Sequence, residues 1–105
     1  MANKTYSKNS QSPELQAFIV EPILVACMDD AAMDDIAKEV GKVIPSPFPI
    51  LKDYLFFLIE YGLVSYNGQK RLFSMDDGGW EMMHLLRRQK RINGIDSKDI
   101  VITLE

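Results

Sequence analysis

Apolar side chains recur at helical spacing near the start of the chain. The first set is Leu15, Phe18, Ile19, Ile23 and Cys27. This spacing predicts a helix from Pro13 to about Met28, with Ser12 as its capping residue. Pro22 lies inside this stretch and has no backbone N–H, so we expect the helix to kink or restart there.

A second apolar stripe predicts a shorter helix. Its members are Met33, Ile36, Ala37 and Val40. Asp29 or Asp30 can cap the start of this helix, and Gly41 supplies its stop. The prolines between Ile44 and Pro49 then predict a rigid connection, because each proline disfavours helix in the residue before it.

A third helix is predicted to begin near Pro49 and to end at Gly62. With successive residues 100° apart, its buried side holds Leu51, Tyr54, Leu55 and Leu58. Its outer side holds Lys52, Asp53, Phe56 and Glu60. We therefore expect a phenylalanine on the solvent side of this helix.

A hairpin is predicted after the third helix. Asn67-Gly68 indicates a two-residue turn, since both residues tolerate the positive φ that such turns need. The flanking strands are expected at Leu63 to Tyr66 and at Gln69 to Met75. Alternating β-prone residues on both sides of the turn support this interpretation.

The last part of the chain combines one helix with one strand. Asp76 can cap a fourth helix that runs to about Arg91, and Gly94 closes it. Ile100 to Leu104 is rich in β-branched residues and predicts a further short strand. The expected class is mainly α, with a small antiparallel β-hairpin.

The segment from Lys52 to Leu86 resembles the archaeal winged-helix family of predicted transcriptional regulators. The resemblance rests on the run Leu58-Ile59-Glu60-Tyr61-Gly62-Leu63-Val64 and, after the hairpin, on Phe73, Met75, Asp76 and Gly79. It implies a winged helix-turn-helix fold, with a three-helix core, a wing and a C-terminal helix. It also implies that the third helix enters the major groove and that the hairpin tip approaches the DNA backbone or minor groove. The domain would span 13–92, preceded by a flexible segment 1–12 and followed by an extension 93–105 with the short strand.

Charge is unevenly distributed along the 105 residues, which suffice for one domain. The net charge is −3. Residues 1–40 carry −4, residues 41–75 carry +2 and residues 76–105 carry −1. The region of the hairpin is therefore mildly basic, whereas the whole chain is more acidic than is usual for a nucleic-acid protein.

The residue inventory argues against catalysis and against a metal site. Cys27 and His84 are the only cysteine and histidine, so cysteine cages, histidine sites and proton-shuttling pairs lack their parts. We expect Cys27 in the core and His84 on a helix surface. Asp29-Asp30 and Asp34-Asp35 are expected as helix caps and solvated charges rather than as a metal site. We expect no enzyme activity and no cofactor. Without an apolar run long enough to cross a bilayer, we expect a cytoplasmic protein.

The residues expected to contact duplex DNA lie in three places. They are Lys52 on the third helix, Asn67, Gln69, Lys70 and Arg71 on the hairpin, and Arg87, Arg88 and Arg91 on the fourth helix. Cations on a hairpin also protect against edge pairing, and cations at a helix end also complement its dipole. Only Lys52 on the third helix has a side chain suited to base reading, beside two carboxylates. Contact through the wing and the DNA backbone is therefore expected.

A protein-binding alternative depends on apolar residues. The expected interface comprises Phe56, Met82, Met83, Ile100 and Ile102, which a homodimer would cover. The sequence thus predicts a dimeric, DNA-associated transcriptional regulator. The alternative is a winged-helix module that binds protein and has lost DNA binding.

Overall fold

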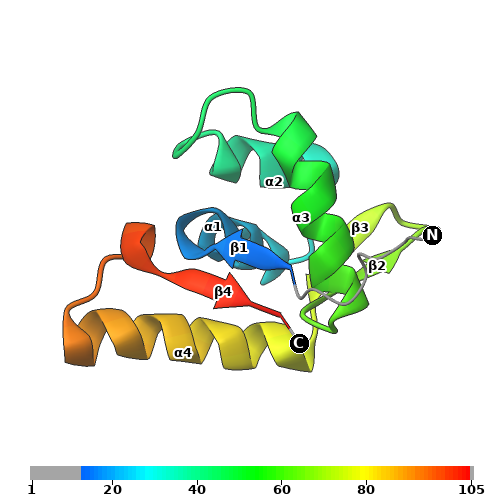
Figure 1. The fold of residues 1–105 in the computed structure, drawn as a ribbon. Coiled ribbons are helices and arrows are strands. Elements are labelled where there is room, and N and C mark those ends of the chain that lie inside the picture. The colour runs from blue at the N-terminus through cyan, green and yellow to red at the C-terminus, as the bar shows by residue number, and fades with distance from the viewer. Residues whose placement is uncertain (1–12, 105) are drawn as a thin grey trace, which may run out of the picture.

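The computed structural model describes residues 13–104 of the chain, and the expected flexible segment 1–12 lies outside them (Figure 1). In chain order the elements are β1 (Glu14–Gln16), α1 (Ala17–Cys27), α2 (Met33–Val40), α3 (Phe48–Glu60), β2 (Val64–Asn67), β3 (Leu72–Met75), α4 (Asp77–Asn93), the 3-10 helix η2 (Ser97–Asp99) and β4 (Val101–Thr103). The expected mainly helical class with a small antiparallel hairpin is confirmed.

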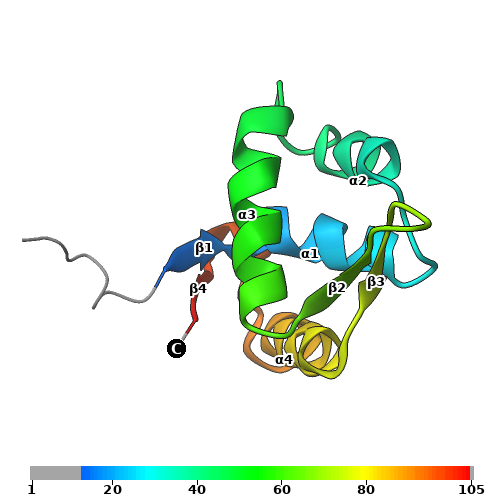
Figure 2. The ribbon, with the colours of Figure 1, turned by 90° about the vertical axis from the view of Figure 1, so that its right-hand side faces the viewer.

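Helix α1 lies in the middle of the molecule, with α2 above it, α4 below it and α3 beside it in both views (Figures 1 and 2). Its residues are therefore apolar on several sides, and Ile23 and Leu24 are fully buried. The helix continues through Pro22, so the expected restart is wrong. One proline removes only one hydrogen bond of the helix, and the surrounding packing holds the rest.

The first described residues form a strand where a helix was expected. Residues Glu14–Gln16 pair antiparallel with β4, and Leu15 lies opposite Ile102. The backbone N–H of Gln16 also donates to the Tyr54 hydroxyl of α3 at 2.9 Å. The prediction of helix from residue 13 was wrong because these distant partners satisfy the backbone, which local spacing cannot reveal. The predicted strand in the C-terminal extension is confirmed.

Helix α2 is capped differently from the expectation. The residue before it is Ala32, whose backbone N–H donates to the Asp35 carboxylate at 3.2 Å. Asp30 instead has a φ of 49° and accepts a 2.7 Å hydrogen bond from the Ser74 hydroxyl of β3. The connection between α1 and α2 is thereby fastened to the hairpin.

Helices α3 and α4 follow their sequence signals. Gly62, with a φ of 77°, turns the chain after α3, and Gly94, with a φ of 64°, closes α4. The Asp76 carboxylate accepts from the first backbone N–H of α4 at 2.9 Å. Gly79 has a further reason to be glycine, because a Cβ there would overlap the Leu63 carbonyl. The start of α4 therefore packs closely against the entry to the hairpin.

The hairpin has a longer loop than predicted. Asn67 pairs with Leu72, so residues 68–71 form a four-residue loop. The Asn67 side-chain oxygen accepts from the backbone N–H groups of Gln69 and Lys70, at 3.0 and 3.1 Å. Between Asn67 and Leu72 only Arg71 has positive φ, at 56°, so the expected positive φ at Asn67 and Gly68 is wrong. The asparagine side chain stabilises the loop in place of the two-residue turn.

A third segment joins the hairpin. Ala31 and Phe73 exchange two backbone hydrogen bonds, of 2.8 and 2.7 Å. The segment between α1 and α2 therefore lies beside β3, and β3 lies between it and β2. In the part of the chain that the structure describes, no helix has both the length and the apolar character that crossing a bilayer requires.

Candidate interaction surfaces

The outer face of α3 is apolar and acidic. As predicted, Leu51, Leu55 and Leu58 are buried, and Phe56 is 60% exposed. Three further apolar side chains of α3 are exposed: Phe48, Ile50 and Ile59. We define the α3 patch as Asp53, Phe56 and Glu60, which lie within one side of the helix and are all exposed.

The α3 patch lacks the groups that read base edges. Lys52 is exposed as expected, but it is the one cation of α3. Major-groove readout requires several donors and acceptors, most often from arginine, lysine, asparagine or glutamine. Asp53 and Glu60 would repel phosphates, and an exposed phenylalanine offers no hydrogen bond. The chemistry of this face is better suited to a protein surface.

The hairpin tip is polar and projects from the molecule. Gln69, Lys70 and Arg71 are exposed, and the side-chain oxygen of Asn67 is occupied by the loop backbone. Figure 2 shows the hairpin rising from the lower end of α3 towards α2. Arg71 and Tyr66 line a small hollow together with Asp34 at the start of α2. Asp34 therefore lies near Arg71, one of the two cations of the hairpin loop.

The outer face of α4 mixes basic and apolar residues. Leu85 and Ile92 are exposed, and they line one hollow along the helix with Arg88 and Arg91. We define these four residues as the α4 patch. His84 is exposed on the same side, as expected, and Arg87 is exposed next to it. The exposure of Leu85 and Ile92 beside the arginines was not predicted, although the same helical spacing places them on this side of the helix.

Lys90 has a structural role within the basic run of α4. Its ammonium group lies 2.9 Å from the Glu21 carboxylate of α1. This ion pair fastens the last turns of α4 to the central helix. Lys90 is therefore less free than its arginine neighbours to meet a partner.

The three groups of predicted DNA contacts do not form one surface. The C-terminal end of α4 and the hairpin tip lie at opposite ends of the molecule in Figure 1. Lys52 lies on the second turn of α3, which precedes both of them in the chain. The predicted contacts are therefore three separate groups rather than one continuous basic patch.

Most of the predicted protein interface is part of the core. Met83 and Ile102 are buried, and Met82 and Ile100 are half-buried against the core. The expectation that these four residues form a free apolar surface was wrong, because α4 turns its methionines inward and β4 pairs with β1. Phe56 alone retains the expected exposure. Composition could indicate excess apolar area but not which face of α4 carries it.

The candidates for metal or thiol chemistry in residues 13–104 are the acidic side chains, His84 and Cys27. No three histidine, cysteine or acidic side chains are placed there to hold a metal ion. Cys27 is fully buried, and burial raises the pKa of its thiol to about 12, with a further contribution from Asp30. A thiol in this environment is unreactive.

No protein-family model, curated protein sequence or solved structure matches the chain. What the protein binds must therefore be inferred from its own side chains.

Proposed function

We propose that this protein is a winged-helix domain that acts as a protein-interaction module, and that its partner is a second copy of the same chain. The order α1, α2, α3, β2, β3 supports the winged-helix assignment. The Ala31–Phe73 bridge supports it further, since it adds a third short strand from between α1 and α2. α4 follows the hairpin as the C-terminal helix.

The exposure of Phe56 between two carboxylates is the observation that carries this proposal. A winged helix that reads DNA presents polar and basic residues on the helix that enters the groove. Here the corresponding helix, α3, exposes a large aromatic ring flanked by Asp53 and Glu60. Burying that ring against protein is favourable, whereas placing the carboxylates against phosphates is not.

The α4 patch is a complementary surface for the α3 patch. Arg88 and Arg91 can meet Asp53 and Glu60, while Leu85 and Ile92 offer an apolar bed for Phe56. The two patches lie on different helices of one copy. In a two-fold dimer the contact would therefore form twice, with each α3 patch on the partner's α4 patch.

Phe56→Glu is expected to weaken self-association in sedimentation equilibrium. Loss of a central aromatic anchor commonly costs about 2 kcal/mol, so we expect the dissociation constant to rise roughly 30-fold. Val101→Glu is the matched control, because Val101 is 59% exposed and lies on β4. The two substitutions introduce the same charge at similarly exposed positions, so they should affect folding equally little.

The result is read from the two variants together. Wild type and Val101→Glu should both associate, with unchanged circular dichroism in all three proteins. A wild-type mass that stays monomeric at high concentration would overturn the proposal. So would a Phe56→Glu variant that associates as tightly as Val101→Glu.

Duplex DNA remains a second candidate partner, favoured by the hairpin tip alone. Lys70 and Arg71 are exposed there on a loop whose conformation is supported by Asn67. Two long cations on a projecting hairpin can contact phosphates without sequence preference. This contact would leave the α3 patch free, so DNA and protein binding are compatible.

A further inference from the structure

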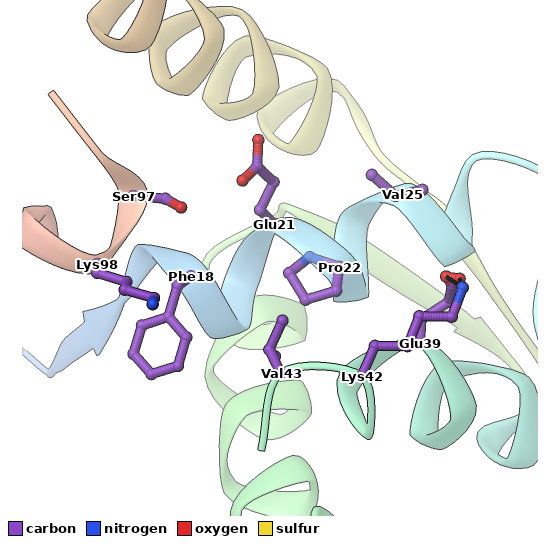
Figure 3. Close-up of a pocket in the computed structure, with 9 residues that line it drawn as sticks. All are labelled: Phe18, Glu21, Pro22, Val25, Glu39, Lys42, Val43, Ser97 and Lys98. Carbon is purple, nitrogen blue, oxygen red and sulfur yellow. Dashed lines mark hydrogen bonds and ion pairs between the residues drawn. The ribbon is translucent and has the colours of Figure 1, made fainter. Parts of the chain in front are cut away.

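A hollow of about 480 Å³ lies beside α1, and none of its lining residues belongs to the α3 patch or the α4 patch. Figure 3 shows its lining, which comes from α1, from α2 and the turn that follows it, and from η2. Its volume is in the range of small-molecule sites in proteins, roughly 300–1,000 Å³. Neither the proposed self-association nor the proposed DNA contact assigns a role to its lining residues.

The walls of the hollow are apolar. They consist of Phe18, Pro22 and Val25 on α1 and of Val43 after α2. In Figure 3 the Pro22 ring points towards Val43. Val25 and Val43 are 42% and 47% exposed, so the chain leaves them uncovered. An apolar ligand body would remove this surface from water, which is favourable in proportion to the area covered.

Two carboxylates in the hollow are already neutralised. Glu21 is held by the Lys90 ammonium at 2.9 Å, and Glu39 is held by the Lys42 ammonium at 2.8 Å. Both pairs are also hydrogen-bonded through the second carboxylate oxygen, at 3.0 and 3.1 Å. These two acids therefore add little net negative charge to the hollow.

Lys98 is left as the unbalanced charge of the lining. It comes from η2, and no salt bridge involves it within residues 13–104. In Figure 3 its ammonium group lies on the same side as the Phe18 ring. A cation beside an apolar wall is suited to a ligand that carries one acid group on an apolar body.

We propose that this hollow binds a small monocarboxylate with an aliphatic or aromatic body. The body packs against Phe18, Pro22 and the two valines, and the carboxylate pairs with Lys98. Since η2 belongs to the C-terminal extension, the bound acid connects that extension to α1 and to the end of α2.

Octanoate is the probe for this site, titrated into the full chain and followed by amide chemical shifts. We expect saturable shifts at Phe18, Val43 and Lys98, with a dissociation constant in roughly the millimolar range for so small a ligand. Octanol tests the acid group, because it has the same alkyl chain without the charge. It should bind about tenfold more weakly, as expected for loss of a charge-assisted contact.

Two pairs of variants separate the contributions of charge and apolar surface. Lys98→Ala should bind octanoate only as well as octanol, while Lys98→Arg should retain the preference for the acid. Val43→Asp should abolish the saturable shifts, and Val101→Asp, at an exposed valine outside the hollow, should retain them.

The proposal is overturned if octanoate gives no saturable shifts or if the shifts map outside the hollow. It is also overturned if Lys98→Ala keeps the preference for octanoate over octanol. Folding of each variant is checked by its undisturbed amide spectrum far from the hollow. The outcome is independent of whether the protein self-associates.

Discussion

Cys27 illustrates how burial determines chemistry at the scale of one residue. The thiol lies at the end of α1 with no exposed surface. Its pKa rises from 9.0 to about 12, mainly because burial disfavours the thiolate and secondarily because Asp30 is nearby. The sequence was sufficient to predict a core cysteine, since Cys27 continues the apolar spacing of the first helix.

The raised pKa of Cys27 predicts a specific dependence of stability on pH. Between about pH 9 and 12 the unfolded chain loses the thiol proton while the folded chain retains it. The contribution is therefore complete below pH 9 and is lost as the pH rises through this window. Urea unfolding at several pH values should show a steeper alkaline loss of stability for wild type than for Cys27→Ala.

A thiol reagent provides the accompanying check. At pH 8 the native protein should react slowly and the urea-unfolded protein rapidly, because only the latter exposes the thiol. Equal alkaline slopes for wild type and Cys27→Ala, or rapid labelling of the native protein, would contradict this account of Cys27.

At the scale of elements, prediction succeeded where the signals were local. Gly62, Asp76 and Gly94 fix the ends of α3 and α4 through positive φ or side-chain capping, which neighbouring residues alone determine. The hairpin was correctly located, but its loop was not. Asn67 can adopt positive φ in a two-residue turn, or its side chain can accept hydrogen bonds from the loop backbone. The strand pairing decides between these two conformations.

The hairpin carries its own prediction about DNA. If Lys70 and Arg71 each contact one phosphate, Lys70→Glu/Arg71→Glu should lower the slope of log affinity against log salt by about 1.8 for duplex DNA. Lys38→Glu/Lys42→Glu makes the same change in net charge on and just after α2. Gel-shift titrations at two salt concentrations would measure both variants.

The control decides how the DNA result is interpreted. If the hairpin variant loses much of its affinity for duplex DNA and the α2 variant loses little, phosphate contact by the tip is supported. Equal losses would indicate only a response to net charge. Absence of wild-type binding at low salt would remove DNA as a partner of the hairpin.

At the scale of the whole molecule, the sequence could not predict that the two ends of the described chain pair with each other. β1 and β4 lie near opposite ends of the sequence, and local spacing made the first of them appear helical. Their pairing buries Leu15, Ile102 and Leu104. Contrary to the expectation, the apolar side chains Ile102 and Leu104 of the tail are therefore not available to a partner. The exposure of Phe56 was predictable because helical geometry alone determines it.

The distribution of surface charge also emerges only in the folded molecule. Acidic residues accompany Phe56 on α3, whereas arginines accompany Leu85 and Ile92 on α4. The α3 patch combines apolar area with two carboxylates, and the α4 patch combines it with two arginines, which outnumber the one acid that lines the same hollow, Glu81. This complementarity predicts association between copies that weakens as salt screens the ion pairs.

Mixing two charge-reversed variants tests this association most directly. Asp53→Lys/Glu60→Lys reverses the α3 patch, and Arg88→Glu/Arg91→Glu reverses the α4 patch. Each variant alone should sediment as a weaker associating species than wild type, because like charges then oppose each other. An equimolar mixture should regain association, since both contacts of the mixed dimer again join opposite charges. A mixture no more associated than its separate components, or variants that associate alone as wild type does, would contradict the proposed contact.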